Sequence, residues 1–165
     1  MQVFPAVVVI AILGDTHLPR GARRLPAACV EILRAAELIV HTGDFTARSV
    51  LDDLRELGRV EAVYGNMDEL AVREVLPARL VVESEGLRIG VVHSGGPRAG
   101  REARLRGWFP DCDLVAYGHS HQPEIASYDG CWIVNPGSPT ERRRAPAHTL
   151  AVVECGVPRL VEVEG

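Results

Sequence analysis

Lysine is absent from this sequence, and all 18 of its basic residues are arginine. The chain also lacks an excess of positive charge, because 22 acidic residues give it a formal net charge of −4 at pH 7. This balance argues against binding to long nucleic acids, which requires a basic surface. The absence of lysine fits a GC-rich genome, and a use of arginine for bidentate phosphate contacts is the alternative interpretation.

No apolar run reaches the roughly 18 residues of a membrane-spanning helix, although apolar residues make up 47% of the chain. The most hydrophobic segment, residues 3–13, has no basic region before it and runs directly into Gly14 and Asp15. It therefore does not fit a secretory signal peptide. We interpret it as a buried strand and expect a soluble, cytoplasmic protein with no membrane partner.

The four cysteines include no C-x-x-C pair; they are Cys29, Cys112, Cys131 and Cys155. A zinc site made of thiolates with the usual spacing is therefore unsupported. Three of the four lie in apolar segments. We expect all four to be reduced thiols that are mostly buried.

The order of the predicted elements indicates the fold class. Apolar strands alternate with amphipathic helices in the first half of the chain, whereas the second half contains mostly strands. The predicted elements are strand 6–14, helix 26–37, strand 38–43, helix 46–58, strand 60–65, a hairpin of 79–84 and 87–94, helix 98–108, strand 112–118, a hairpin of 124–128 and 131–135, and an antiparallel pair 148–155 and 158–164. We expect an α/β fold in which two mixed sheets are flanked by helices, a four-layer α/β/β/α sandwich forming one domain over residues 1–165.

Local signals mark the ends of the two helices predicted in the first half. Pro26 suits the first turn of helix 26–37, because its missing N–H would have no partner there. Thr46 is predicted to cap the start of the next helix, and Gly58 is predicted to end it.

Unusual polar residues follow predicted strands at five places, within ILGDTH, IVHTGD, VYGNMD, GVVHSG and VAYGHSH. Each one alone has an ordinary explanation, because Asp, Asn and His occur in turns and at helix caps. Turn chemistry gives no reason to choose His repeatedly, however, and five of the six histidines belong to this set. The carboxyl ends of strands in an open α/β sheet face a common crevice, so we predict one metal site there.

The chemistry of these side chains points to a pair of divalent ions. The candidate ligands are Asp15, His17, Asp44, Asn66, His93, His119 and His121. Carboxylate, amide and imidazole groups without thiolates favour Mn²⁺, Fe²⁺ or Zn²⁺. Seven ligands are too many for one ion and suit two ions that share a carboxylate, as in phosphatases and nucleases. We predict Mn²⁺, with Fe²⁺, Ni²⁺ or Zn²⁺ as alternatives.

The motifs resemble those of a known family. D-x-H, G-D, G-N-x-D, an apolar strand ending in His, and G-H-x-H occur here in the order typical of calcineurin-like metallophosphoesterases. The short length, GNMD and NPGS at residues 135–138 resemble its small phosphodiesterase branch, which also contains the retromer scaffold subunit. The resemblance covers nearly the whole chain and implies hydrolysis of a small phosphate ester, by in-line attack of a metal-bridging hydroxide.

The resemblance also implies a role for each ligand. One ion would be held by Asp15, His17, Asp44 and His121. Asp44 would bridge to a second ion, completed by Asn66, His93 and His119. Asp44, Asn66 and His93 are accordingly the expected catalytic residues.

Two positions depart from the family's pattern. Met67 stands where many relatives have His and others have Cys, and its thioether cannot donate a proton to a leaving group. Good leaving groups such as aryl alcohols are therefore favoured. Asp68 could replace the missing acid, but we prefer a role in orienting a ligand imidazole. The segment HSGGP at 93–97 also lacks a second His, which often contacts metal or phosphate in larger relatives.

Further residues have two interpretations each. His41 either orients Asp44 or packs behind it, and packing is preferred. Asn135 and Ser138, in the segment 135–144, either contact substrate or support the site from behind. The three arginines that end this segment either grip a phosphate or belong to a solvated loop. Trp108 and Phe109 either cap the core or shape a lid over the site, and we prefer the core.

The alternative function is a non-catalytic protein-interaction scaffold with the same fold. A scaffold tolerates the loss of metal ligands, yet all seven positions here hold competent groups. This favours an enzyme that acts on a small phosphate ester. A homo-oligomer is left open, since dimers are the commonest assembly of soluble proteins.

Overall fold

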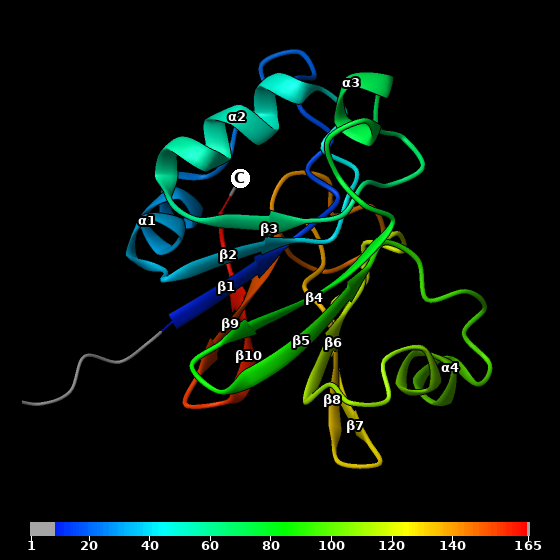
Figure 1. Ribbon diagram of the computed structural model, residues 1–165. Coiled ribbons are helices and arrows are strands. Elements are labelled where there is room, and N and C mark those ends of the chain that lie inside the picture. The colour runs from blue at the N-terminus through cyan, green and yellow to red at the C-terminus, as the bar shows by residue number, and fades with distance from the viewer. Residues whose placement is uncertain (1–8, 165) are drawn as a thin grey trace, which may run out of the picture.

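The computed structural model describes residues 9–164, which form ten strands and four helices (Figure 1). The strands are β1 (Val9–Leu13), β2 (Leu38–His41), β3 (Val60–Ala62), β4 (Arg79–Ser84), β5 (Leu87–Val92), β6 (Leu114–Ala116), β7 (Glu124–Tyr128), β8 (Cys131–Asn135), β9 (Thr149–Glu154) and β10 (Val157–Glu162). The helices are α1 (Ala27–Ala35), α2 (Arg48–Leu57), α3 (Leu70–Arg73) and α4 (Arg101–Trp108). Residues 6–8 of the predicted first strand lie outside the described residues.

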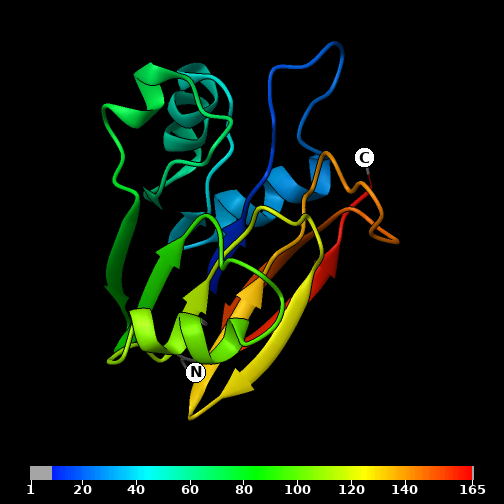
Figure 2. The ribbon, with the colours of Figure 1, turned by 90° about the vertical axis from the view of Figure 1, so that its right-hand side faces the viewer.

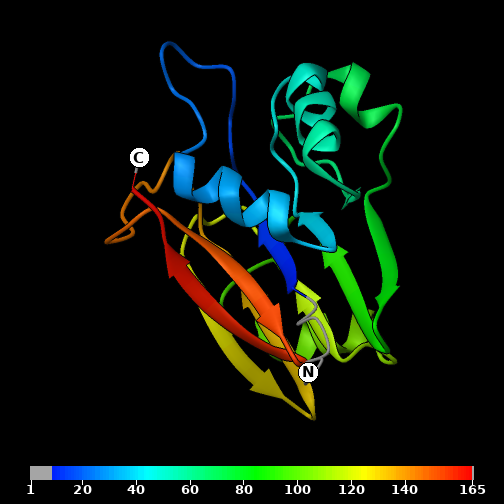
Figure 3. The same cartoon turned by 90° about the vertical axis from the view of Figure 1, so that its left-hand side faces the viewer.

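The strands form two mixed sheets, as the sequence predicts. Their orders are β10-β9-β1-β2-β3 and β4-β5-β6-β8-β7. In the first sheet β1 is parallel to β2 and antiparallel to β9. In the second, β6 is parallel to both β5 and β8. Helix α4 covers the outer face of the second sheet (Figure 2), and α1 covers the first sheet (Figure 3), so the expected four layers are confirmed.

Strand β1 shows why its sequence is apolar at every position. Ile10 and Ile12 point into the core between the two sheets. Ala11 and Leu13 point to the opposite face, into a core shared with α1 and α2. A strand covered on both faces has no solvated side, so it carries no polar alternation. A third core, between α4 and the second sheet, includes Phe109, which agrees with the core assignment of this residue.

The start of α2 differs from the prediction. Ala47 is its N-cap, so the predicted cap at Thr46 is wrong. The backbone of Thr46 has a φ of +88°, and its N–H donates to Asp68 Oδ1 at 2.8 Å. Thr46 is thus part of a turn held by a distant carboxylate. Gly58 is the C-cap as predicted, and Pro26 is the N-cap of α1.

Two other differences follow from the loop that precedes α3. Strand β3 ends at Ala62 and not at residue 65, because Tyr64 N–H donates to Pro77 O, outside the sheet. The short helix α3 was not predicted from the sequence. Among the described residues, no helix has the length and apolarity needed to cross a membrane.

Glycines allow the loops at the carboxyl ends of the strands to touch. A Cβ on Gly65 would lie 2.1 Å from Asp44 Oδ1, and one on Gly14 would lie 1.9 Å from Thr42 Oγ1. Neither position has room for a side chain. The loops after β1 and β2 also run side by side, with Asp15 N–H donating to Gly43 O at 3.0 Å. The predicted site residues are brought together by this contact.

Candidate metal centre

All seven predicted ligands lie close together after strands of the two sheets. Six of them form two groups whose ligand atoms lie within 4.8 Å of one another: Asp15 with His17 and His121, and Asp44 with His93 and His119. The seventh, Asn66, joins the second group. Its Oδ1 lies 2.9 Å from His93 Nε2 and 3.1 Å from His119 Nδ1.

Asp44 lies between the two groups. Its Oδ2 is 3.5 Å from His17 Nε2 in the first group and 3.3 Å from His93 Nε2 in the second. Its Oδ1 accepts a hydrogen bond from Met67 N–H at 2.8 Å, which fixes the orientation of the carboxylate. This is the placement that a carboxylate shared by two ions requires.

Five of the seven residues have a left-handed backbone. The φ angles are +52° at Asp15, +46° at His17, +64° at Asp44, +75° at His119 and +62° at His121. This conformation is uncommon for residues with a Cβ and costs on the order of 1 kcal/mol or more each. Such strain persists where function requires a particular side-chain direction. In D-x-H the strained residues bring Asp15 and His17 to the same ligand group, whereas in H-x-H they send His119 to the second group and His121 to the first.

Backbone carbonyl groups orient two of the histidine rings. His93 Nδ1 faces Thr42 O at 2.9 Å, and His121 Nδ1 faces Glu141 O. A carbonyl oxygen only accepts, so in the neutral imidazole the proton is on Nδ1 and Nε2 is free to bind a cation. The Nε2 atoms of His17 and His121 are buried without any hydrogen-bond partner. Buried polar atoms of this kind are costly unless a ligand satisfies them, so the residues fit a metal ion.

The carboxylates of the centre also need a cation. Burial raises the pKa of Asp15 to about 7, although the nearby charge of His93 opposes this shift. Burial by itself would raise the pKa of Asp44 too, but the hydrogen bond and charge of His93 outweigh it and hold that pKa below its usual value. Asp15 thus carries a proton near neutral pH until a stronger cation replaces it.

Most of the imidazoles are neutral, as metal ligands must be. Burial lowers the pKa of His17 and of His119, and it lowers the pKa of His121 to about 4. His93 is the exception. Burial acts against its protonation, but the charges of Asp44 and Asp15 raise its pKa above the usual value. His93 Nε2 lies 3.3 Å from Asp44 Oδ2, so the carboxylate favours positive charge at this place.

Asp68 supports the centre in a way that the sequence did not predict. Its Oδ2 accepts hydrogen bonds from Gly65 N–H at 2.7 Å and Asp44 N–H at 3.0 Å, and its Oδ1 accepts from Thr46 N–H. The carboxylate holds backbone and does not orient an imidazole, so the preferred role is corrected.

His41 lies behind the Asp44 loop. Its ring stacks on Phe45 with centroids 3.6 Å apart, and its Nδ1 accepts from Gly43 N–H at 3.0 Å. Complete burial lowers its pKa to about 3, so the ring is neutral. A neutral ring in this contact supports the loop that carries Asp44.

Asn135 and Ser138 are buried beneath the ligand loops. Asn135 Nδ2 donates to Ser120 Oγ at 3.0 Å, and Ser138 Oγ donates to Asp15 O at 2.8 Å. Of their two predicted roles, this geometry favours supporting the site over contact with substrate.

The arginines that end the segment 135–144 are exposed, and they differ from one another. Arg142 donates to Ala145 O at 2.8 Å. Burial has the largest effect on the pKa values of Asp15, His17, His119 and His121, and other groups of the site have the next largest effects. The positive charge of Arg143 has a smaller effect and lowers all four pKa values. Arg143 is thus within electrostatic reach of the centre.

Glu141, in the same segment, was missed in the sequence. Its backbone and side chain both lie against the first group. Nothing in NPGSPTERRR distinguishes this Glu from a solvated one.

Two mixed sheets carrying paired His and Asp clusters at the strand ends define a metallophosphoesterase. The chain belongs to the calcineurin-like phosphoesterase superfamily, whose domain model matches residues 8–156. This confirms the resemblance found in the motifs.

The chain is 38% identical over 138 residues to a probable metallophosphoesterase of Methanothermobacter thermautotrophicus, covering 82% of this chain and 80% of that protein. It is 26% identical over 144 residues to a phosphodiesterase of Methanocaldococcus jannaschii, covering 78% and 82%. Solved structures with the same fold include Vps29 of Chaetomium thermophilum (TM-score 0.75, 22% identity, 93% of each chain). Another is a novel archaeal phosphodiesterase (TM-score 0.74, 23% identity, 94% of this chain and 100% of the other).

Proposed function

We propose that this protein, as a single domain over residues 1–165, is a dinuclear metal-dependent phosphodiesterase that hydrolyses a small phosphate ester. The observation that carries the proposal is the position of Asp44 Oδ2 between His17 and His93, one from each ligand group. The phosphodiesterase among its sequence relatives supports the reaction class. The acidic net charge favours a small ester over a long nucleic acid.

The residues would divide between two ions as the family pattern implies. Asp15, His17 and His121 would hold one ion, Asn66, His93 and His119 would hold the other, and Asp44 would bridge them. When bound, two divalent ions supply an activated water for in-line attack and neutralise charge on the phosphoryl oxygens. We propose Mn²⁺, because the donor set is oxygen and imidazole without thiolate.

The chain itself keeps these groups ready for binding. The carbonyl oxygens of Thr42 and Glu141 hold the rings of His93 and His121 in the orientation that aims Nε2 at the centre. Arg143 contributes positive charge for the substrate phosphate. A cytoplasmic location and the oligomeric state remain predictions.

Metal removal tests the proposal directly. Protein treated with a chelator is expected to lose hydrolysis of bis-p-nitrophenyl phosphate, and Mn²⁺ is expected to restore it as two ions bind per chain. The assay follows nitrophenol release beside metal analysis of the same samples. Activity that survives complete removal of metal would contradict the proposal.

The leaving group lacks an evident proton donor. Met67 is 57% exposed next to Asp44, where a thioether donates nothing. The carboxylate that follows Met67 in the chain, Asp68, is occupied by three backbone N–H groups. Esters with good leaving groups should therefore be the better substrates.

Met67→His is expected to raise kcat on alkyl phosphodiesters by about 10- to 100-fold, because general acid catalysis contributes on the order of 10²-fold or more. Hydrolysis of the nitrophenyl ester, which needs no acid, should change little. The exposed position tolerates the ring. Met67→Leu is the matched control, and an equal change for both ester types would refute the leaving-group argument.

A scaffold function is the alternative, and the Vps29 structures share this fold. The complete set of seven ligands, two of them with unpartnered buried nitrogens, favours the enzyme.

A further inference from the structure

The segment 138–141 fastens the two loops that carry the first ligand group. Ser138 Oγ donates to Asp15 O at 2.8 Å, and Thr140 Oγ1 donates to Thr16 O at 2.6 Å. The backbone oxygen of Glu141 accepts the hydrogen bond from His121 Nδ1. These contacts leave the side chain of Glu141 at the edge of the centre.

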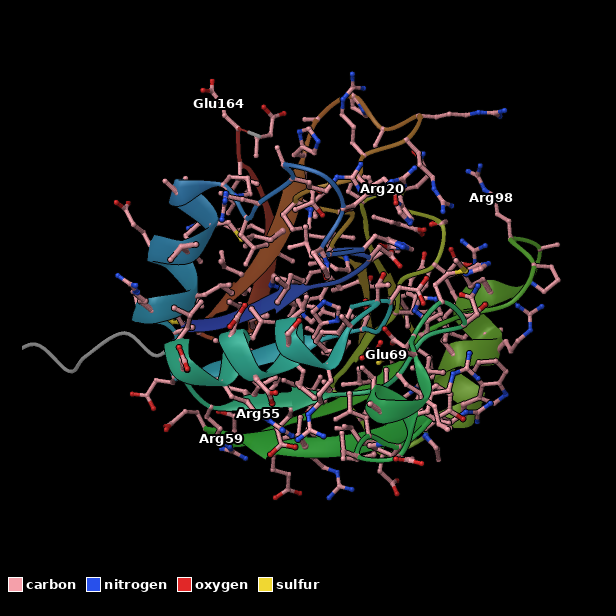
Figure 4. The ribbon with its side chains drawn as sticks, turned by 90° about the horizontal axis from the view of Figure 1, so that it is seen from above. Arg20, Arg55, Arg59, Glu69, Arg98 and Glu164 are labelled. Carbon is pink, nitrogen blue, oxygen red and sulfur yellow. The ribbon has the colours of Figure 1, made fainter. Side chains whose placement is uncertain are left out.

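The Glu141 carboxylate is shared between an arginine and a ligand nitrogen. Its Oε1 accepts from Arg20 Nη1 at 2.7 Å, and Arg23 Nη1 lies 3.8 Å away. Its Oε2 lies 3.7 Å from His17 Nε2, one of the two buried histidine nitrogens without a hydrogen-bond partner. Arg20, labelled in Figure 4, is 66% exposed, whereas Glu141 is only 17% exposed. The carboxylate is therefore held near the centre by one exposed arginine, Arg20, with the less exposed Arg23 at a longer distance.

The separation from His17 is compatible with binding to one ion. Two atoms that each lie about 2.1 Å from the same ion are about 3.0–4.2 Å apart, depending on the angle between them. The distance from Glu141 Oε2 to His17 Nε2 falls in this range, as does the 3.5 Å from Asp44 Oδ2 to the same nitrogen.

We propose that Glu141 is an additional carboxylate ligand of the first ion, which it binds from the His17 side after leaving Arg20. The inference rests on the proposed two-ion site and extends it, because none of the family motifs includes this residue. Glu141 would add a third carboxylate to Asp15 and Asp44 at this ion. Arg20 is the competitor, since it pairs with the same carboxylate.

This ligand would also influence which metal is bound. Zn²⁺ is satisfied by four ligands, whereas Mn²⁺ takes more oxygen ligands. A third carboxylate therefore favours Mn²⁺ over Zn²⁺ at the first ion. The loss of the Glu141 carboxylate should therefore lower the affinity for Mn²⁺ more than the affinity for Zn²⁺.

Titration of the metal-free protein with Mn²⁺, followed by the electron paramagnetic resonance of free Mn²⁺, tests the inference without an activity assay. Glu141→Gln is expected to weaken the binding of one of the two ions by at least about 10-fold, because the loss of a residue that only hydrogen-bonds to a ligand already costs about 10- to 100-fold. It retains the backbone oxygen that holds His121. When Zn²⁺ competes with Mn²⁺, the substitution should lower the affinity for Zn²⁺ less than the affinity for Mn²⁺.

Arg20→Gln provides the decisive comparison. Removal of the competing guanidinium is expected to strengthen binding of the same ion by about 2- to 5-fold, the range for an exposed pair. If the Arg20–Glu141 pair served only to anchor the loop, Glu141→Gln and Arg20→Gln would both weaken Mn²⁺ binding. That result would overturn the inference. Glu85→Gln, in the turn between β4 and β5, is the matched control and should change nothing.

The outcomes separate this inference from the proposed function. If Glu141→Gln still binds two ions with unchanged Mn²⁺ affinity, the proposed role of Glu141 is wrong. The proposed phosphodiesterase function is not affected by that result. A wild-type protein that binds no ion overturns both. Circular dichroism of each metal-free variant verifies that the fold is retained.

Discussion

Asp44→Asn is expected to lower kcat/KM for bis-p-nitrophenyl phosphate by about 10³-fold or more, because two ions together supply several kcal/mol of transition-state stabilisation. The amide retains the shape of the side chain, and its oxygen can still accept the Met67 N–H. It loses the negative charge that lies between His17 and His93. A neutral group cannot hold two cations in a buried site.

Metal analysis gives the second readout for this variant. Wild-type protein should bind two Mn²⁺ ions, and Asp44→Asn should bind one or none under the same conditions. Asp52→Asn, on the exposed face of α2, is the control for the same chemical change and should behave as wild type. Full activity in Asp44→Asn would exclude the bridging role.

Asp68→Ala is expected to lower the free energy of unfolding of the metal-free protein by about 3–5 kcal/mol. Three backbone N–H groups, from Asp44, Thr46 and Gly65, lose their acceptor in this variant. An unsatisfied buried donor costs about 1–3 kcal/mol, and water entering near the partly buried Thr46 reduces the sum. Urea unfolding at neutral pH measures the change.

The same substitution should weaken Mn²⁺ binding, because the loop of Asp44 loses its anchor. Asp52→Ala, which removes only an exposed pair with Arg48, is expected to change stability by no more than about 0.5 kcal/mol. Equal stability of Asp68→Ala and wild type would show that the three hydrogen bonds are replaced by water and do not hold the turn.

The fold class was predictable because the pattern of each strand reports its surroundings. The continuous apolar run that contains Ile10 and Ala11 belongs to a strand covered by a second sheet on one face and by helices on the other. The cap of α2 was not predictable. Thr46 is a good capping residue, but its N–H donates a hydrogen bond to Asp68, which lies 22 positions further along the chain. A local preference was thus outweighed by a tertiary hydrogen bond.

The candidate site divides in the same way. Asp15, His17 and the other ligands could be identified because their chemistry and their places after strands are visible in the chain itself. Asp68 was recognised, but its role was not, because two of its three donors, Asp44 and Thr46, lie in a loop more than 20 positions away along the chain. Glu141 was missed because it looks like any acidic residue of a charged loop.

The sequence by itself determined the family, the four-layer fold and the set of candidate metal ligands, since these depend on residue type, periodicity and order. The resemblance already gave Asp44 its place between two ligand groups, and the distances from its Oδ2 to His17 and His93 agree with that place. Only the tertiary structure decided that Glu141 lies beside His17. The physical reason is that a metal site depends on distances between atoms of different loops. Those distances arise when the sheets pack and glycines such as Gly65 let the loops approach within contact.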